Sequence, residues 1–443
     1  MSAAHDGRVI RGAVLTYRDD PVVAGPERAV RFHRDGAVAV AGNGRIVWCG
    51  HAGRLPRRFA SLPSDDHGDA LVMPGFIDAH VHFPQYRMLA APGRDLLDWL
   101  NRFTFPEEQR YAAAPHARAA AEAFLDRLVQ HGTTAAVVFS TVHRSATDTF
   151  FAVAERRGQA IVSGKTLMDR NAPEALRDDP ESGTRDSEAL IKRWHRRGRL
   201  RYAITVRFAI TSTEDQLREA GALAVRHPDC HVHSHLSESE GEIELVRRQF
   251  PWAKDYTDVY DRFDLLGPRS LYAHGIHLSE RECARLSETG ATVVHCPTSN
   301  TFLGSGLFDA AHVGRADRPV RIGIGTDVGG GTSYSMLHTL GEAYKVAMLG
   351  GRTPGAHELF HLATRGNAVN LGLDDEIGSL EPGRWADVVV LDPAATPVLE
   401  ARHTLSESLE DMLFALAVLG DDRAVRATYV AGRCVWGGSS RTA

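Results

Sequence analysis

The chain has 443 residues, of which 43% are hydrophobic and 24% are charged, as in an ordinary globular protein. The formal net charge of -5 gives no basic surplus for nucleic acid, and no apolar run approaches the ~20 residues that cross a bilayer. Five cysteines without a C-x-x-C pair predict neither a disulfide framework nor a cysteine zinc site. Because residues 1–8 also lack a signal-peptide core, we expect a cytoplasmic protein without nucleic acid or membrane partners.

Short β-strands are predicted at both ends of the chain, where apolar residues are interrupted by glycine and by polar runs such as residues 20–35. The middle of the chain lacks this pattern. We therefore expect residues 1–70 and 376–443 to form one small β-sandwich domain from the N- and C-terminal segments. The predicted strands are residues 9–15, 37–41, 45–48, 386–392, 425–430 and 431–436.

Strand and helix signals alternate through residues 71–375. Eight strand candidates over about 260 residues are typical of a (β/α)8 TIM barrel, which we predict as the catalytic domain. The predicted strands are residues 71–82, 133–139, 160–163, 202–208, 230–235, 270–274, 291–295 and 321–326. The predicted helices are residues 112–131, 147–157, 187–197, 213–226, 240–250, 279–289 and 335–349.

Metal-binding residue types fall at the carboxyl ends of four predicted strands, where barrel enzymes place their chemistry. The first strand ends in His80 and His82, which share a face because alternate residues of a strand point the same way. The fifth, sixth and eighth strands end in His235, His274 and Asp327. The sequence therefore predicts one metal site at this rim.

Strand alternation alone does not choose among three histidines of the fifth strand. His231, His233 and His235 share one face, but only His235 stands at the strand end. We expect His231 and His233 to be deeper packing or hydrogen-bonding residues.

Short motifs surround these positions. They are PGFIDAHVH at 74–82, PQY at 84–86, LLDWL at 96–100, TFPEE at 104–108, HLSE at 235–238, AHG at 273–275, HCPTSN at 295–300 and GTDVGGGTSYSM at 325–336. The first motif resembles the opening of the amidohydrolase superfamily, and the others resemble the guanine deaminase family within it. The likeness extends from about residue 70 to residue 390. The segment between Gln85 and Asp95 is shorter than is usual in that family.

The resemblance implies that His80, His82, His235 and Asp327 bind one metal ion per chain. Three neutral imidazoles and one carboxylate suit Zn²⁺, and Fe²⁺ or Mn²⁺ fit the same ligands. Zinc lowers the pKa of bound water to about 7, so hydroxide forms at neutral pH. The formal charges of zinc, hydroxide and one carboxylate sum to zero, which suits an uncharged heterocycle.

The implied reaction is hydrolytic deamination of guanine to xanthine and ammonia, in purine catabolism or salvage. Glu238 is expected to carry protons, and His274 to support the attacking hydroxide. Asp327 would hold the attacking oxygen as well as the metal. In the alternative interpretation, Glu238 only caps the next helix, since residues 237–240 have the composition of a helix start.

Four residues are expected to contact the substrate. Arg207 offers a planar donor fork, and Gln85 offers both a donor and an acceptor. Phe208 and Trp99 offer aromatic surface for a flat ring, although Trp99 equally fits a lid or core residue. The resemblance implies the roles of Gln85, Arg207 and Phe208, and it also implies a homodimer.

Other interpretations remain open. Residues 357–361 match H-E-x-x-H, the helix motif of zinc proteases. A two-metal cyclic amidohydrolase would use a modified lysine, for which Lys165 is the candidate. The chain could also deaminate another ring, such as 8-oxoguanine, pterin, cytosine or adenosine, or be a non-catalytic scaffold that retains the fold.

Overall fold

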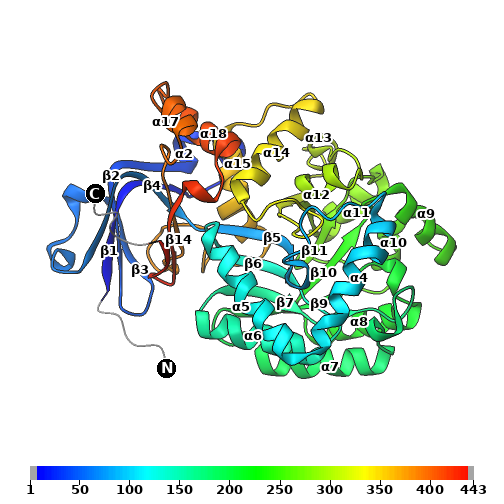
Figure 1. Cartoon of the computed structure of the whole chain (residues 1–443). Helices are drawn as coiled ribbons and strands as arrows, with labels where there is room; N and C mark the ends of the chain where they lie inside the picture. The colour runs from blue at the N-terminus through cyan, green and yellow to red at the C-terminus, as the bar shows by residue number, and fades with distance from the viewer. Residues whose placement is uncertain (1–6, 438–443) are drawn as a thin grey trace.

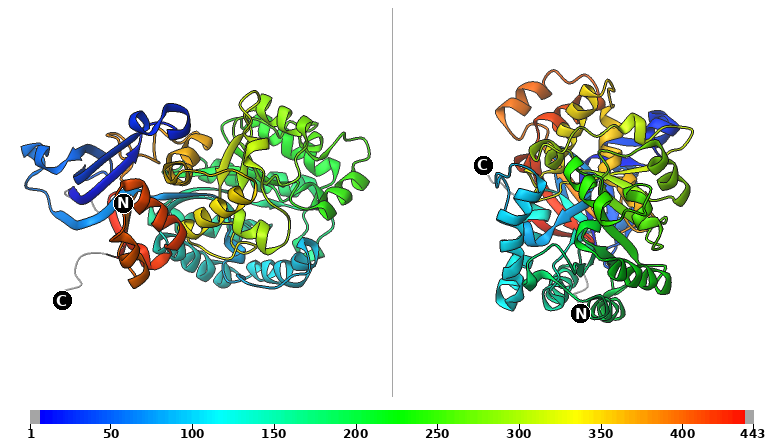
Figure 2. Two further views of the ribbon diagram at one scale, coloured as in Figure 1. Left: turned by 90° about the horizontal axis from the view of Figure 1, so that it is seen from above. Right: turned by 90° about the vertical axis from the view of Figure 1, so that its right-hand side faces the viewer.

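A computed structural model describes residues 7–437 of the chain. They form a nearly closed barrel of eight parallel strands and a separate mixed β-sheet built from both ends of the chain (Figure 1). The sheet lies at one end of the molecule and the barrel at the other (Figure 2). Within residues 7–437, no helix has the length and apolar character needed to cross a membrane.

Every neighbouring pair of strands in the barrel is parallel. All eight strands predicted from the apolar pattern are present, with ends shifted by a few residues, so the barrel prediction is confirmed. Residues 71–74 of the first predicted strand belong instead to the separate sheet. In spatial order they are β5 (Phe76–His82), β6 (Thr133–Phe139), β7 (Ala160–Gly164), β9 (Leu200–Val206), β10 (His231–Leu236), β11 (Ser270–His274), β12 (Thr292–His295) and β13 (Arg321–Ile324), and the short β8 (Thr166–Leu167) pairs with β9.

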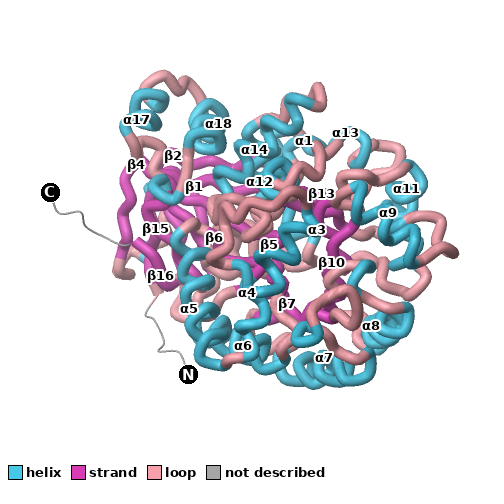
Figure 3. The backbone as a smooth tube through the Cα atoms, turned by 45° about the vertical axis from the view of Figure 1, so that its right-hand side comes forward, coloured by secondary structure: helices cyan, strands magenta, loops and turns pink. Residues whose placement is uncertain are grey.

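Helices cover the outside of the barrel (Figure 3). The seven predicted helices correspond to α5 (Ala114–Gln130), α6 (Arg144–Arg157), α7 (Pro180–Trp194), α8 (Glu214–Arg226), α9 (Glu240–Gln249), α11 (Glu280–Thr289) and α14 (Met336–Leu349). Helix α7 begins seven residues before the predicted position, since Asp179 caps it and Pro180 occupies its first turn. Further helices are α10 (Tyr256–Asp261), α12 (Pro297–Phe302), α13 (Ala310–Val313), α15 (Ala356–His361) and α16 (Asn367–Asn370).

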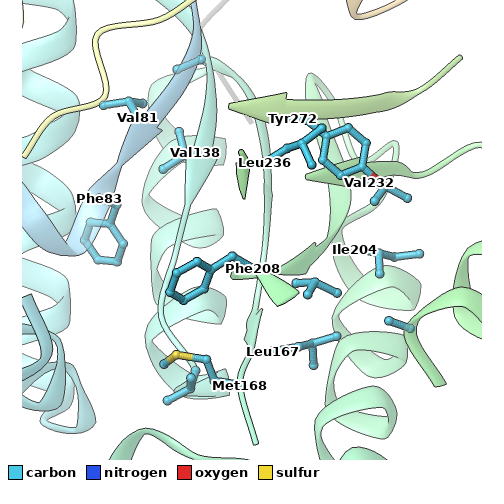
Figure 4. Packing of buried hydrophobic residues seen from close by; sticks show 14 of the residues in the cluster. Val81, Phe83, Val138, Leu167, Met168, Ile204, Phe208, Val232, Leu236 and Tyr272 are labelled. Atoms are coloured by element: carbon cyan, nitrogen blue, oxygen red, sulfur yellow. The ribbon is translucent and has the colours of Figure 1, made fainter. Parts of the chain in front are cut away.

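The connection from β5 to β6 makes an excursion over the barrel mouth before α5 begins. It contains α3 (Leu96–Trp99), a π-helical turn (Leu100–Thr104) and α4 (Phe105–Gln109). Leu96, Trp99 and Leu100 are buried against the same apolar cluster as the barrel strands. Figure 4 shows part of this cluster, in which Phe208 packs among residues of several strands.

The separate sheet has seven strands, all antiparallel to their neighbours except the pair β1 and β4. Apolar side chains from the N- and C-terminal strands of this one mixed sheet form a single cluster, so the two ends of the chain build one β-domain together, as predicted. Its order is β16 (Arg433–Gly437), β15 (Val425–Val430), β14 (Val388–Leu391), β4 (Ser64–Pro74), β1 (Arg8–Tyr17), β2 (Val30–Val40) and β3 (Ile46–His51). Helices α17 (Pro397–His403) and α18 (Leu409–Leu419) separate β14 from β15.

The polar segment at residues 20–35 is not simply a break between strands. It contains α1 (Pro21–Ala24) and α2 (Pro26–Ala29), and β2 begins at Val30. The start of β2 pairs with the end of β1 while its side chains stay partly exposed, so charged residues are tolerated there. The domain limits at residues 70 and 375 stay a proposal, and Gly75 alone separates β4 from β5.

One buried ion pair joins the barrel to the sheet, and its loss is expected to destabilise the protein. The Asp387 carboxylate accepts hydrogen bonds from Arg199, next to β9, and from the backbone N–H of Ala431 at 2.9 Å. Because Asp387→Ala leaves a buried guanidinium unpaired, it should lower the free energy of unfolding by about 3–5 kcal/mol. Urea titration measures this, and Asp317→Ala, which removes an exposed carboxylate paired with Arg315, should be indistinguishable from the native protein. Equal stability of Asp387→Ala and the native chain would contradict the prediction.

Candidate metal centre and pocket

The barrel closes where β5 meets the segment after β13. The N–H of Asp327 donates to the carbonyl of His80, and the N–H of His82 donates to the carbonyl of Val328, both at 2.8 Å. Gly325 permits this approach, since a Cβ there would lie 2.7 Å from the backbone nitrogen of His80. These hydrogen bonds place Asp327 beside both histidines of β5, although Asp327 lies 245 positions after His82 in the sequence.

Asp78 links the two chain segments that close the barrel, β5 and the segment after β13. Its carboxylate accepts hydrogen bonds from the N–H and the hydroxyl of Thr326, at 3.0 and 2.5 Å, and from the N–H of His80 at 3.2 Å. Burial raises the pKa of Asp78 to about 6 despite these hydrogen bonds. Asp78 thus orients the residues of both segments.

Polar atoms of the four predicted ligands meet at one point of the rim. The Nε2 atoms of His80 and His82 lie 3.2 Å apart, and each lies 3.2 Å from Oδ1 of Asp327. Nε2 of His235 lies 3.2 Å from Nε2 of His82. The structure brings all four side chains together, as expected from their places at strand ends.

The electrostatics of this cluster favour neutral imidazoles at His82 and His235 and an ionised carboxylate at Asp327. Burial lowers the pKa of His82 to about 4 and that of His235 well below its ordinary value. Burial alone would raise the pKa of Asp327, but hydrogen bonds with His80 and His82 and charge interactions with His80 and His274 hold it well below the usual range. A neutral imidazole has a free lone pair and can bind a cation.

Hydrogen bonds on the outer sides of the rings direct lone pairs inward. Nδ1 of His235 lies 2.6 Å from the carbonyl oxygen of Arg207, so Nδ1 carries the proton and Nε2 carries the lone pair. Nδ1 of His80 lies 2.8 Å from Nε2 of His233, which can accept a hydrogen bond from it. Converging lone pairs and a carboxylate oxygen are the donor set that a divalent metal ion requires, so these residues fit such an ion.

His274 and Glu238 lie beside the four clustered side chains. Nε2 of His274 lies 3.3 Å from Oε2 of Glu238 and 3.9 Å from Oδ2 of Asp327. Asn300 donates from Nδ2 to Nδ1 of His274 at 3.0 Å, and the Ser305 hydroxyl donates to Glu238 at 3.1 Å. Burial, with the charges of neighbouring carboxylates, raises the pKa of Glu238 well above its ordinary value.

Glu238 does not cap the helix that follows it. The cap of α9 is Ser239, whose hydroxyl accepts from the N–H of Glu242. The Glu242 carboxylate accepts from the N–H of Glu238 at 2.8 Å and from the Tyr256 hydroxyl at 2.7 Å. The capping interpretation of Glu238 was therefore wrong. Ser239 and Glu242 satisfy the start of the helix, so the Glu238 side chain is not needed there and can face the pocket.

One pocket contains Glu238 and His274 together with three of the four clustered side chains, while His80 lies fully buried beneath it. Every residue predicted to contact substrate lines the same pocket. The indole N–H of Trp99 is buried there without a hydrogen-bond partner among the described residues, so it can donate to a ligand. The lining residues are His82, Gln85, Leu96, Trp99, Leu100, Arg207, Phe208, His235, Glu238, His274, Leu303, Asp327 and Gly330.

Sequence reasoning missed Glu108, which joins two of these residues. Nη1 of Arg207 donates to both carboxylate oxygens of Glu108, at 2.9 and 2.8 Å, and Nε2 of Gln85 donates to Oε1 at 3.2 Å. Glu108 belongs to the TFPEE motif, but no spacing rule connects it with a residue 99 positions away. Asp78 carried a usable signal, since it shares a strand face with His80 and His82.

The other two histidines of β10 make hydrogen bonds, as expected. His233 contacts Nδ1 of His80, and Nε2 of His231 lies 2.9 Å from the carbonyl oxygen of Leu371.

The H-E-x-x-H sequence is a packing helix in this fold. His357 and His361 both pack edge-on against Tyr17 of β1, and Glu358 pairs with Arg352. Among the residues described, the motif forms no cluster of metal-binding atoms. The protease interpretation has no structural support.

The candidate for a modified lysine lies elsewhere as well. Lys165 follows β7, the third barrel strand, and its ammonium group pairs with Asp178. Lys165 does not line the pocket that holds the clustered histidines.

Residues 71–435 match the sequence profile of the Amidohydrolase family. The chain belongs to the amidohydrolase family. The guanine deaminase of Escherichia coli K12 is 43% identical over 440 residues, which cover 98% of this chain and 99% of that protein. The crystal structure of a guanine deaminase from Bradyrhizobium japonicum superposes with a TM-score of 0.94 at 37% identity, covering 98% of this chain and all of that one.

A third relative within the amidohydrolases is a guanine deaminase from C. acetobutylicum, solved with guanine bound in its active site. It is 26% identical to this chain, with a TM-score of 0.87 and coverage of 97% of this chain and 100% of the other. The family match and the near-complete coverage of these relatives identify the barrel and the sheet as one amidohydrolase enzyme.

Proposed function

We propose that this amidohydrolase converts guanine and water to xanthine and ammonia. The observation that carries the proposal is the meeting of His80, His82, His235 and Asp327 beside Glu238 in one pocket. The similarity of the whole chain to guanine deaminases supports guanine as the ring.

The four clustered side chains would hold one divalent ion, and Zn²⁺ suits three imidazoles and a carboxylate. When bound, the ion supplies Lewis-acid activation of water near neutral pH. Fe²⁺ and Mn²⁺ fit the same donors. His274 stays outside this set and is free to hydrogen-bond the reacting oxygen.

Glu238 would move the protons of the reaction. It takes a proton from the attacking water and delivers it to the ring nitrogen next to the amine-bearing carbon. The second proton of the water goes by the same carboxyl to the amine, which leaves as ammonia. The Ser305 hydroxyl donates to Oε1 of Glu238 at 3.1 Å, which helps the carboxyl keep one orientation during these transfers.

His274 and Asp327 would hold the attacking oxygen between them. Nε2 of His274 lies 3.9 Å from Oδ2 of Asp327, which leaves room for a reacting atom near both groups. Asn300 fixes the ring of His274 through Nδ1, so Nε2 is the nitrogen that faces the reaction. Charge that develops on the oxygen is stabilised by such prearranged donors.

Gln85, Arg207, Phe208 and Trp99 would hold the purine. The guanidinium of Arg207, which follows β9, and the amide of Gln85, which follows β5, are linked through Glu108. Phe208 and Trp99 belong to the apolar cluster and would contact the faces or edge of the ring. The positions of these side chains in the pocket support the proposed roles.

An ammonia-release assay over guanine, 8-oxoguanine, pterin, cytosine and adenosine tests the proposed ring. We expect turnover of guanine to exceed that of each other ring by at least about 100-fold in kcat/KM, since mismatched donors leave buried polar groups unpaired. The measurement is ammonia released by the metal-loaded enzyme. Turnover of another ring without turnover of guanine would contradict the proposal.

Metal content separates this proposal from a two-metal amidohydrolase, because we expect one ion per chain and not two. The homodimer, the cytoplasmic location and a place in purine catabolism or salvage stay predictions that follow from the family resemblance.

A further inference from the structure

Glu108 is a buried charged residue beside the pocket that takes part in no chemical step of the proposed reaction. It lies on α4, in the excursion over the barrel mouth, and its side chain is 1% exposed. Its partner Arg207, just beyond β9, is 3% exposed and lines the pocket. A buried carboxylate that pairs with a substrate-facing cation can set the charge that a ligand meets.

Glu108 contacts only one of the three guanidinium nitrogens of Arg207. Nη1 of Arg207 donates to both oxygens of Glu108, and no other guanidinium nitrogen of Arg207 has a hydrogen-bond partner among the described residues. Nη2 and Nε therefore remain as donors for a ligand. The formal charges of Arg207 and Glu108 sum to zero, so these donors belong to a neutral pair.

Glu108 also fixes the amide of Gln85. Nε2 of Gln85 donates to Glu108 at 3.2 Å, while its Oε1 accepts from the N–H of Gly329 at 3.2 Å. The two contacts define which end of the amide is the donor and which is the acceptor. One carboxylate thus positions both polar side chains that face the ring.

We infer that Glu108 is a positioning and charge-balancing residue that makes the pocket selective for a neutral purine over an anionic one. This inference rests on the proposed function, because it concerns the same pocket. In this arrangement Arg207 donates hydrogen bonds to a ring carbonyl or ring nitrogen, and it does not act as a binding site for an anion. Xanthine gives up a ring proton more readily than guanine. The charge balance between Glu108 and Arg207 therefore also weakens binding of the ionised product.

Two substitutions separate charge from position. Glu108→Gln keeps the shape and one acceptor oxygen but leaves Arg207 as an uncompensated cation. Glu108→Asp keeps the charge but withdraws the carboxylate by one methylene. A purely structural role, in which Glu108 only holds the excursion against the barrel, would alter the binding of neutral and anionic ligands by the same factor.

Calorimetric titration of the metal-loaded enzyme at pH 7.5 with hypoxanthine, a neutral purine, and with urate, a purine anion, provides the test. The native enzyme should bind hypoxanthine more tightly than urate. Glu108→Gln should change the ratio of the two affinities in favour of urate by at least about tenfold, because the buried cation then meets the anion without a counter-charge. Glu108→Asp should weaken both ligands and keep the native ratio.

An unchanged ratio in Glu108→Gln would overturn the inference, and so would a shift towards urate of equal size in Glu108→Asp. If Glu108→Gln does not fold, Glu108→Ala, which removes the same charge, is titrated in its place, and an unchanged ratio in that variant overturns the inference. The readout is independent of turnover, so it remains valid if guanine is not the substrate. Failure of the proposed function is seen separately, as absence of ammonia release from guanine by the native enzyme.

Discussion

Glu238→Gln is expected to lower kcat for guanine by about 10²- to 10⁴-fold, the range that a positioned proton carrier contributes. Glutamine has nearly the same shape and can still accept from the Ser305 hydroxyl, which donates to Oε1 of Glu238. It cannot take a proton from water or hand one to the ring. The substitution therefore removes the chemistry and keeps the packing.

Steady-state ammonia release and metal analysis of the same preparation measure this effect. The metal content should stay at one ion per chain, since Glu238 is not among the four side chains proposed to bind it. Glu240→Gln is the matched control, because Glu240 is exposed in the first turn of α9 and should leave kcat unchanged. A Glu238→Gln enzyme with native kcat would rule out the proposed proton carrier.

Replacing His235 by Ala is expected to abolish both metal binding and activity. Nε2 of His235 lies 3.2 Å from Nε2 of His82, and Nδ1 is fixed by the carbonyl of Arg207. Substitution of residues that only support ligands weakens metal binding by about 10–100-fold, so loss of a ligand should weaken it by more than about 100-fold. Asp327→Ala should have an effect of similar size and for the same reason.

The measurement is metal content after dialysis against a weak chelator, followed by assay with added Zn²⁺. His361→Asn is the control, because His361 belongs to the H-E-x-x-H helix and packs against Tyr17. This variant should retain the native metal content. Native metal content in His235→Ala, or metal loss in His361→Asn alone, would refute the assigned ligands.

Local signals in the sequence were sufficient to predict the barrel. Each strand of the barrel is a short apolar run, and each following helix shows helical periodicity, so the alternation is visible residue by residue. The candidate site residues were found because His80, His82, His235, His274 and Asp327 stand at strand ends, where a barrel gathers side chains, and the family resemblance implied which four of them bind the metal. The helix starts were less accurate, as in α7, because the cap at Asp179 precedes the apolar pattern.

The contacts around the site could not be predicted in the same way. Glu108 meets Arg207 only because the excursion after β5 folds back over the barrel mouth. Asn300 meets His274 because α12 begins directly after β12 and lies next to the end of β11. Both pairings depend on tertiary packing, which a single sequence does not encode as a spacing. Residue type alone could therefore assign roles to the residues that line the pocket, but not to the residues that hold them in place.

Anomalous diffraction from crystals of the metal-loaded enzyme tests the central claim most directly. The account predicts a single metal peak at about 2.0–2.2 Å from Nε2 of His80, His82 and His235 and from a carboxylate oxygen of Asp327. A second peak beside a modified Lys165, or a single peak out of reach of those four atoms, would contradict it.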